Sequence, residues 1–273
     1  MKKLVLLGAA LLAVLGFVLF FNQETEENGD FTVLKVGATP VPHAELLELV
    51  KDDLLDQGIK LEVVEFTDYV TPNIALSDGD IDANFFQHVP YLESFAKEHK
   101  LDLASIGTIH VEPLGLYSKS VESVDELKEG AQIAIPSDAV NGGRALILLE
   151  HRGLITLKEN AGLEATEKDI IDNPKNFEFK AIEAAQLARV LEDVDAAIIN
   201  GNYALEAGIS PAEDALILED AESPYANIVT TRAGDTEDEN LLALVKALQT
   251  EKISDHIKNN YGGGVVEAFG RPE

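Results

Sequence analysis

The segment 137–144, which directly follows a predicted strand, contains two glycines and ends in an arginine. The start of a helix presents free N–H groups and a partial positive charge, which suit an anion. Arg144 adds a planar guanidinium group that can hold a carboxylate through two parallel hydrogen bonds. The segment therefore predicts a carboxylate site at Arg144. An ordinary helix cap followed by a surface arginine is the alternative.

Two further segments, 68–73 and 84–91, place aromatic side chains where a strand passes into a helix. Successive strand residues point in opposite directions, so Phe86 and His88 share a face. Aromatic rings in such a place can line an apolar pocket that has a tyrosine hydroxyl or an imidazole at its edge. Plain core packing is the alternative for each ring taken by itself.

Asparagines stand at the ends of two predicted strands. Asn200 and Asn202 follow one apolar strand, and Asn227 begins another. Their amide groups both donate and accept hydrogen bonds, so they can hold an ammonium or a carboxylate group. Asparagine is also a routine turn former, and from the local sequence alone both interpretations stay open.

The chain lacks the common motifs of catalysis and of cofactor binding. It has no nucleophile elbow, no phosphate-binding loop, no zinc-protease motif and no dinucleotide-binding glycine pattern after a strand. Six histidines are scattered, and two short His–Glu pairs, at 43–45 and at 110–112, lack further obvious metal ligands. We therefore expect no catalytic residue, no metal and no cofactor.

The composition narrows the classes of partner. The chain has 273 residues, a formal charge of −28, 46% hydrophobic residues and no cysteine. A strongly acidic chain repels phosphate, and no Lys or Arg cluster occurs beyond Lys2 and Lys3, so we expect no nucleic-acid partner. The missing cysteine excludes disulfides, zinc–thiolate sites and thioether-linked lipid. The hydrophobic fraction suffices for a sizeable core.

The first thirty residues predict export. Lys2 and Lys3 precede an apolar run over residues 4–21, which as a helix would rise about 27 Å, roughly the hydrocarbon thickness of a bilayer. Positive charge before the run and acidic residues after it place the body outside the cytoplasm. Because no small-residue cleavage site follows, we interpret residues 1–22 as an uncleaved signal-anchor, with a cleaved signal peptide as the alternative. Residues 23–32 form an acidic linker.

The body alternates short strands with amphipathic helices, which predicts an α/β fold with largely parallel sheets. The expected strands are 34–38, 60–66, 81–85, 103–118, 132–136, 177–182, 194–200, 215–219 and 228–231. The expected helices are 42–57, 72–77, 89–99, 143–152, 185–191, 239–250 and 252–259. One set of elements precedes residue 118 and another follows it, so we expect two lobes. A cleft between them, at the carboxyl ends of strands, is the expected ligand site.

Six motifs occur in the order that is typical of one family, and they lie at residues 36–45, 68–73, 82–88, 143–146, 194–204 and 223–227. Each motif is weak by itself. Together, over residues 34–271, they closely resemble the NlpA/MetQ family, the substrate-binding lipoproteins of methionine ABC importers.

The resemblance implies a type II periplasmic-binding-protein fold, whose two α/β lobes close on one amino acid. The implied lobes are residues 33–113 with 226–273, and residues 114–225. The implied partners are an ABC permease and its ATPase subunits, and the implied place is the extracytoplasmic face of the cytoplasmic membrane.

The resemblance also implies a ligand site. The methionine carboxylate would meet Arg144, and Asn141, Asn202 and Asn227 would orient its carboxylate and amino groups. The thioether would enter a pocket of aromatic side chains and an imidazole, formed by Phe66, Tyr69, Phe86, His88 and Tyr91. Physical chemistry agrees, because a buried zwitterion needs charge-assisted hydrogen bonds and sulfur packs well against aromatic rings.

Two departures from the family pattern are evident. The lipobox cysteine is absent, so the N-terminal helix is expected to replace the lipid anchor. The usual Asn-Glu-Gly-Arg reads Asn-Gly-Gly-Arg at residues 141–144, so a carboxylate at the helix start is missing. Alternative ligands are D-methionine and a methionine-containing dipeptide. Alternative functions are an exported α/β hydrolase and a surface interaction protein that uses its acidic face.

Overall fold

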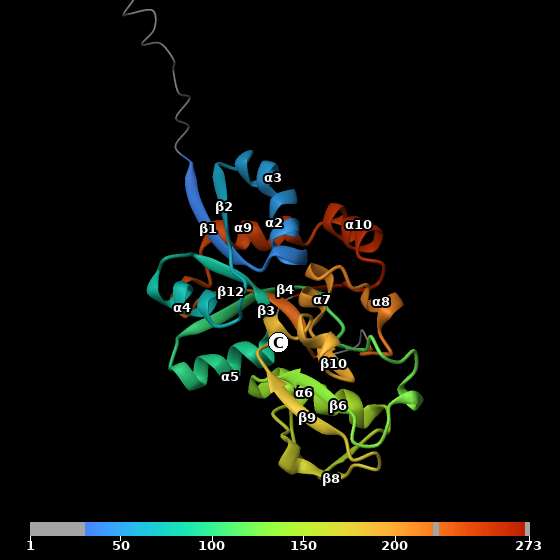
Figure 1. Ribbon diagram of the computed structural model, residues 1–273. Coiled ribbons are helices and arrows are strands. Elements are labelled where there is room, and N and C mark those ends of the chain that lie inside the picture. Colours follow the sequence, from blue (N-terminus) through green and yellow to red (C-terminus); the bar gives the residue numbers. More distant parts are fainter. Residues whose placement is uncertain (1–30, 221–223, 271–273) are drawn as a thin grey trace, which may run out of the picture. The chain divides into compact units, whose positions relative to one another are not determined.

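The computed structural model describes residues 31–220 and 224–270. The predicted signal-anchor at 1–22, most of the linker at 23–32, and Ser223 of the last motif lie outside the described residues. The described residues from 33 onward belong to one compact unit, and most of its helices and longer strands are labelled in Figure 1. Within the described ranges, no helix combines the length and the apolar character that a membrane crossing requires.

The larger sheet, here called the first sheet, has six strands. Their order is β13 (Val266–Gly270), β4 (Leu103–Val111), β12 (Ala226–Arg232), β3 (Ala83–His88), β1 (Thr32–Ala38) and β2 (Ile59–Glu65). The second sheet has five strands, in the order β11 (Ile217–Leu218), β5 (Gly115–Tyr117), β10 (Ala196–Ile199), β6 (Gln132–Pro136) and β9 (Glu178–Ile182). A small pair joins β7 (Thr156–Leu157) to β8 (Ile170–Asp172).

Helices and short helical turns connect these strands. The α-helices are α2 (Glu45–Leu49), α3 (Lys51–Leu55), α4 (Thr71–Asp78), α5 (Val89–His99), α6 (Ala139–His151), α7 (Gly201–Glu206), α8 (Pro211–Asp214), α9 (Glu239–Leu248) and α10 (Glu251–Asn260). The short turns are η1 (Pro40–Ala44), η2 (Val124–Glu126), η3 (Glu167–Asp169), η4 (Ala184–Gln186), η5 (Val190–Glu192) and η6 (Ala233–Asp235).

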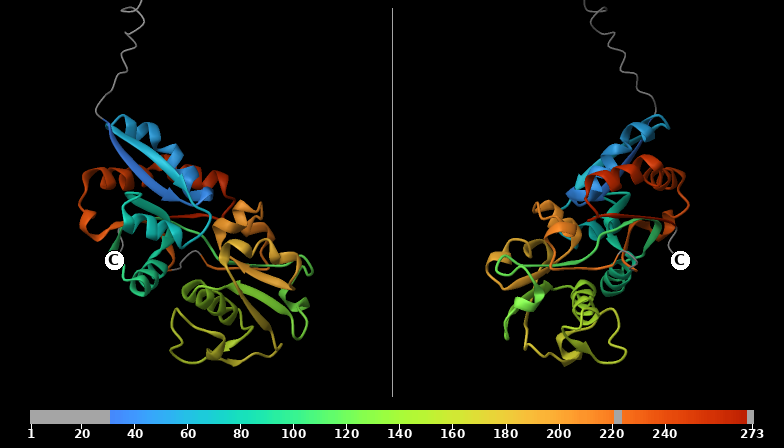
Figure 2. Two further views of the ribbon diagram at one scale, coloured as in Figure 1. Left: turned by 60° about the vertical axis from the view of Figure 1, so that its left-hand side comes forward. Right: turned by 90° about the vertical axis from the view of Figure 1, so that its right-hand side faces the viewer.

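The expected α/β fold with two sheets is confirmed, but the expectation of largely parallel sheets is wrong. β1 pairs with β3, and β6 pairs with β9 and β10, in parallel. In contrast, β12 runs antiparallel to both β3 and β4, and β5 runs antiparallel to β10 and β11. The chain leaves the first sheet through β4 and returns to it through β12, so these neighbours run in opposite directions (Figure 2). The predicted lobe boundaries at 113 and 226 stay a prediction.

Two of the predicted helices differ from the structure in instructive ways. The segment 42–57 is interrupted at Val50 (φ −100°, ψ 1°), yet the predicted apolar face of Leu46, Leu47, Val50 and Leu54 is fully buried. The helix expected from residue 143 begins earlier, at Ala139, because the Asp138 side chain caps it by accepting a hydrogen bond from the N–H of Asn141. The two glycines therefore lie inside α6 and not in a loop before it.

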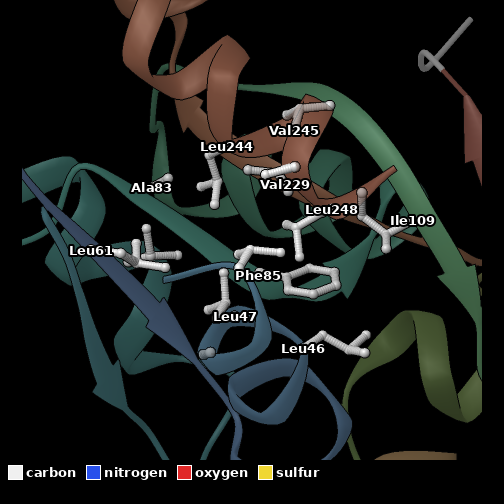
Figure 3. Packing of buried hydrophobic residues seen from close by; sticks show 14 of the residues in the cluster. Leu46, Leu47, Leu61, Ala83, Phe85, Ile109, Val229, Leu244, Val245 and Leu248 are labelled. Atoms are coloured by element: carbon white, nitrogen blue, oxygen red, sulfur yellow. The ribbon is translucent and has the colours of Figure 1, made fainter. Parts of the chain in front are cut away.

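Each sheet buries its own apolar cluster. In the first, Leu46 and Leu47 of α2 and Leu244, Val245 and Leu248 of α9 pack against the strand residues Leu61, Ala83, Phe85, Ile109 and Val229 (Figure 3). A third cluster contains aromatic residues from both sides, among them Tyr69, Phe86 and Tyr91 of the first and Tyr117 and Tyr203 of the second. The functional side chains described next lie where this third cluster meets the strand ends.

Candidate functional site

A small cavity lies between the carboxyl ends of strands from the two sheets. The first-sheet side contributes Tyr69, Phe86, Gln87, His88, Tyr91, Glu112 and Asn227, and the second-sheet side contributes Asn141, Arg144, Asn200, Gly201 and Asn202.

Eight of the nine residues predicted for the site line this cavity: Tyr69, Phe86, His88, Tyr91, Asn141, Arg144, Asn202 and Asn227. Phe66 does not. Its ring packs against the backbone at Gly37, where an added Cβ would lie 2.8 Å from the ring, and it is half-buried behind β1. Its expected place in the thioether pocket stays a prediction.

Three rings form the apolar wall of the cavity. Tyr69 lies 5.8 Å from both Phe86 and Tyr91, measured between ring centroids. The Tyr91 hydroxyl donates to the carbonyl of Tyr69 (3.0 Å), and the Tyr69 hydroxyl donates to Oδ1 of Asn202 across the cavity (2.5 Å). Burial raises the pKa of the Tyr69 hydroxyl, which keeps it a protonated donor.

His88 ends β3 and caps α5. Its Nδ1 accepts a hydrogen bond from the N–H of Tyr91 (3.2 Å), so its proton resides on Nε2, which donates to Oδ1 of Asn141 (3.3 Å). Burial, and next the charge of Arg144, lower the pKa of His88 to about 3. The imidazole is therefore neutral at physiological pH, and it joins the two sides of the cavity through one hydrogen bond.

The asparagine amides leave one donor and one acceptor unused. Asp138 holds the amide of Asn141 (3.0 Å), and the Nδ2 of Asn200 donates to Oδ1 of Asn141 (2.9 Å). Among the described residues, Oδ1 of Asn200 and Nδ2 of Asn202 are buried polar atoms without a hydrogen-bond partner. An unpaired donor and an unpaired acceptor in one cavity suit a ligand that carries both an anionic and a cationic group.

Arg144 is buried, but one edge of its guanidinium is already used. Nε donates to Oε1 of Glu219 (3.0 Å), and Nη2 donates both to Oε2 of Glu219 and to the carbonyl oxygen of Glu112 (2.9 Å). The guanidinium also lies over the ring of Tyr225, 4.2 Å from its centroid. The bidentate contact predicted for a ligand carboxylate is therefore taken by Glu219, and Nη1 is the nitrogen left for a ligand.

Residue 142 carries no carboxylate, but Asp138 lies one turn earlier, at the start of α6. Asp138 caps α6 and accepts hydrogen bonds from both the backbone and the side chain of Asn141. At Gly142 a Cβ would lie 2.9 Å from the carbonyl oxygen of Pro136, so the glycine lets the first turn of α6 lie close to the end of β6.

Four residues that line the cavity are not among the nine predicted for the site: Gln87, Glu112, Asn200 and Gly201. The pairing of Glu112 with His110 was noted only as a metal fragment, and the structure adds His43 to it: His110 Nε2 lies 2.7 Å and His43 Nε2 3.2 Å from Oε1 of Glu112. These three residue types can bind a metal ion, and their ligand atoms lie within 4.8 Å of one another. Here His110 forms a hydrogen bond with the carboxylate and His43 forms one with Oδ1 of Asn227, so we interpret the cluster as a hydrogen-bond network.

The chain is similar to known proteins over most of its length. The family model described as NlpA lipoprotein matches residues 34–269. Membrane lipoprotein TpN32 of Treponema pallidum is 45% identical over 231 residues, which are 85% of this chain and 86% of that protein. The D-methionine-binding lipoprotein MetQ of Escherichia coli is 40% identical over 247 residues, or 89% of this chain and 91% of that protein.

A solved structure is similar over nearly the same range. It is a nutrient-binding protein from Burkholderia cenocepacia bound to methionine, with 44% sequence identity and a TM-score of 0.84. The similarity covers 86% of this chain and all of that one.

Proposed function

The chain belongs to the NlpA lipoprotein family, and we propose that it is the extracytoplasmic substrate-binding component of an ABC importer that takes up methionine. The observation that supports this most is the cavity, which brings together eight residues named by the family resemblance from segments far apart in the sequence. The methionine-bound relative of similar fold supports the same ligand.

The cavity offers a matching group to each end of methionine. Nη1 of Arg144 and the unpaired Nδ2 of Asn202 are donors for the carboxylate. The rings of Tyr69, Phe86 and Tyr91 form a wall suited to a thioether, because sulfur makes favourable contacts with aromatic rings. A substrate-binding component binds methionine and releases it to a permease. This role requires no catalytic residue, metal or cofactor.

Several relatives are lipoproteins by name, which supports a membrane-associated place outside the cytoplasm. This chain has no cysteine to carry a lipid. We therefore propose that the apolar segment within residues 1–22 holds the protein to the cytoplasmic membrane, where its body meets an ABC permease and the ATPase subunits of that permease.

Calorimetric titration of the purified body, residues 23–273, tests the ligand assignment. L-Methionine, D-methionine and L-leucine are titrated separately, and mass spectrometry identifies any small molecule released when the protein is denatured. We expect saturable binding of at least one methionine enantiomer and much weaker binding of leucine. Binding of neither enantiomer, by protein first stripped of ligand and refolded, would refute the proposal.

A further inference from the structure

Two short segments carry the chain from one sheet to the other. The first crossover, residues 112–114, joins β4 of the first sheet to β5 of the second. The second crossover, residues 219–225, joins β11 of the second sheet to β12 of the first. Rigid parts of a protein move relative to each other by bending at the few residues that connect them. Any movement of one sheet against the other must therefore bend both crossovers.

The two crossovers are bonded to each other through Leu114 and Glu219. The N–H of Glu219 donates to the carbonyl oxygen of Leu114 (2.9 Å), and the N–H of Leu114 donates to Oε2 of Glu219 (3.3 Å). Glu219 thus uses both its backbone and its side chain to hold the first crossover. The two connections cannot bend independently while these bonds are in place.

Arg144 bonds to both crossovers at once. Its Nη2 donates to the carbonyl oxygen of Glu112 in the first crossover (2.9 Å) and to Oε2 of Glu219 in the second, while its Nε donates to Oε1 of Glu219 (3.0 Å). The guanidinium also lies 4.2 Å from the ring centroid of Tyr225, at the far end of the second crossover. Because Arg144 belongs to α6, which follows β6, one side chain ties both connections to the second sheet.

The same guanidinium has one edge toward the ligand and another toward the crossovers. Arg144 lines the cavity, and Nη1 is the nitrogen left for a ligand, whereas Glu219 does not line the cavity. The side chains of Arg144 and Glu219 are only 3% and 14% exposed. Removing one partner of a buried ion pair leaves the other charge uncompensated, so the pair resists separation. A carboxylate bonded to Nη1 would therefore restrain the group that holds both crossovers.

We propose that Glu219 is a positioning residue which, through Arg144, couples binding of the ligand carboxylate to the relative movement of the two sheets; this rests on the proposed function. With the carboxylate on Nη1, the guanidinium is bonded to the ligand and to both crossovers, and the crossovers lose freedom to bend. Without the charge of Glu219, Arg144 can still meet the ligand, but it no longer holds the second crossover.

Distances between two spin labels test the coupling in the full-length protein. The chain has no cysteine, so labels can be placed at Lys97→Cys on α5, beside the first sheet, and at Glu159→Cys after β7, on the second-sheet side, both exposed positions. With Glu219 intact, we expect L-methionine to shorten and narrow the distribution of distances. In Glu219→Gln, which keeps the size of the side chain and removes its charge, L-methionine should still bind in calorimetry while this change is lost.

Asp220→Asn is the matched control. It removes the neighbouring carboxylate of the same crossover, whose side chain is 91% exposed and lies 3.8 Å from Arg152. It should show the full change with L-methionine, and Glu219→Asp, which retains the charge, should restore part of it. A full change in Glu219→Gln would overturn the inference. An equal loss in Asp220→Asn would also overturn it, because the effect would then belong to the segment and not to the ion pair.

Hydrogen exchange in the unmodified protein gives a test that does not depend on a variant folding or binding. L-Methionine should slow exchange of the N–H groups of Leu114 and Glu219 at least about fivefold, the lower end of typical coupling between two sites. The N–H of Gly130, which bonds to the carbonyl of Lys175 away from the cavity, should be unaffected. Unchanged exchange at both crossovers with L-methionine bound would overturn the inference and leave the proposed function intact. If neither methionine enantiomer binds, the proposed function itself fails, so the two failures are distinguishable.

Discussion

Replacing Arg144 by alanine removes the cation expected to meet the ligand carboxylate. In the structure the guanidinium is 3% exposed and makes hydrogen bonds with Glu219 and with the carbonyl of Glu112. The variant therefore changes two quantities. It removes a charged donor from the cavity, and it leaves the carboxylate of Glu219 without its partner.

The magnitudes of the two effects differ. Losing a desolvated charge partner costs about 2–5 kcal/mol of binding free energy, so the Kd for methionine should rise about 30-fold to several thousandfold. Breaking a buried ion pair from one side costs about 3–5 kcal/mol of stability. Because the side chain of Glu219 is 14% exposed and can regain water, we expect the lower end, a fall in Tm of about 5–10 °C.

Calorimetric titration and thermal unfolding measure the two effects separately. Arg144→Lys should recover only part of the affinity, because an ammonium group cannot reproduce the planar fork that Glu219 and the ligand share. Arg152→Ala is the matched control from the other end of α6. Its side chain is 43% exposed and bonds to the carbonyl of Leu218 outside the cavity, so affinity should change less than about threefold.

The double variant Arg144→Ala with Glu219→Gln separates direct from indirect action. It removes the stranded carboxylate, so stability should largely return while affinity stays low. If the double variant regains normal affinity, the loss in Arg144→Ala came from Glu219 and the reasoning about the ligand carboxylate fails. Affinity within about threefold of the parent in folded Arg144→Ala would refute it directly.

Stability should fall as the pH drops from about 6.5 toward 4, because His43, His88 and His110 have folded pKa values of about 3 to 4 and the unfolded chain takes up protons first. The free energy of unfolding should change by up to about 4 kcal/mol per pH unit, less the opposing effect of the raised pKa of Glu112. Urea unfolding at stepped pH measures this change, and a free energy of unfolding that does not vary with pH would contradict the prediction. Gly201→Ala should lower stability by about 1–3 kcal/mol and weaken methionine binding, because its Cβ would lie 2.8 Å from that of Glu112; equal stability and affinity would mean that the contact relaxes freely. Because the family resemblance implies two lobes that close on the ligand, solution scattering should give a smaller radius of gyration with methionine than without it; identical curves at saturation would argue against such a motion.

Much of the fold follows from local patterns. Pro90 near the start of α5 and the buried ring of Phe95 belong to a segment whose predicted bounds, 89–99, are those of the helix. Phe86 and His88, which strand alternation predicts to share a face, both line the cavity, and the side chain of Gln87 between them bonds to Asn73 and Asn84. Helix periodicity, capping and strand alternation depend on neighbours within a few residues, so they can be predicted without tertiary structure.

The antiparallel pairing of β12 could not be predicted in the same way. Its sequence predicts one more apolar strand and says nothing of its direction. The direction depends on the path of the chain, which leaves the first sheet after β4 and returns to it at β12. The contact of the Phe66 ring with the backbone at Gly37 could not be predicted for a similar reason, because it depends on how β1 and the residue after β2 lie together.

The sequence by itself determined the acidic, cysteine-free composition, the order of strands and helices, and the family to which the motifs belong. Only the tertiary structure decided the charge partners in the site. Arg144 pairs with Glu219, 75 residues away, while Glu112 accepts hydrogen bonds from His110 and from the N–H of Asn202. Charge pairing acts over a few ångströms in space and is independent of separation along the chain. Which charged side chains pair therefore depends on how the two sheets come together.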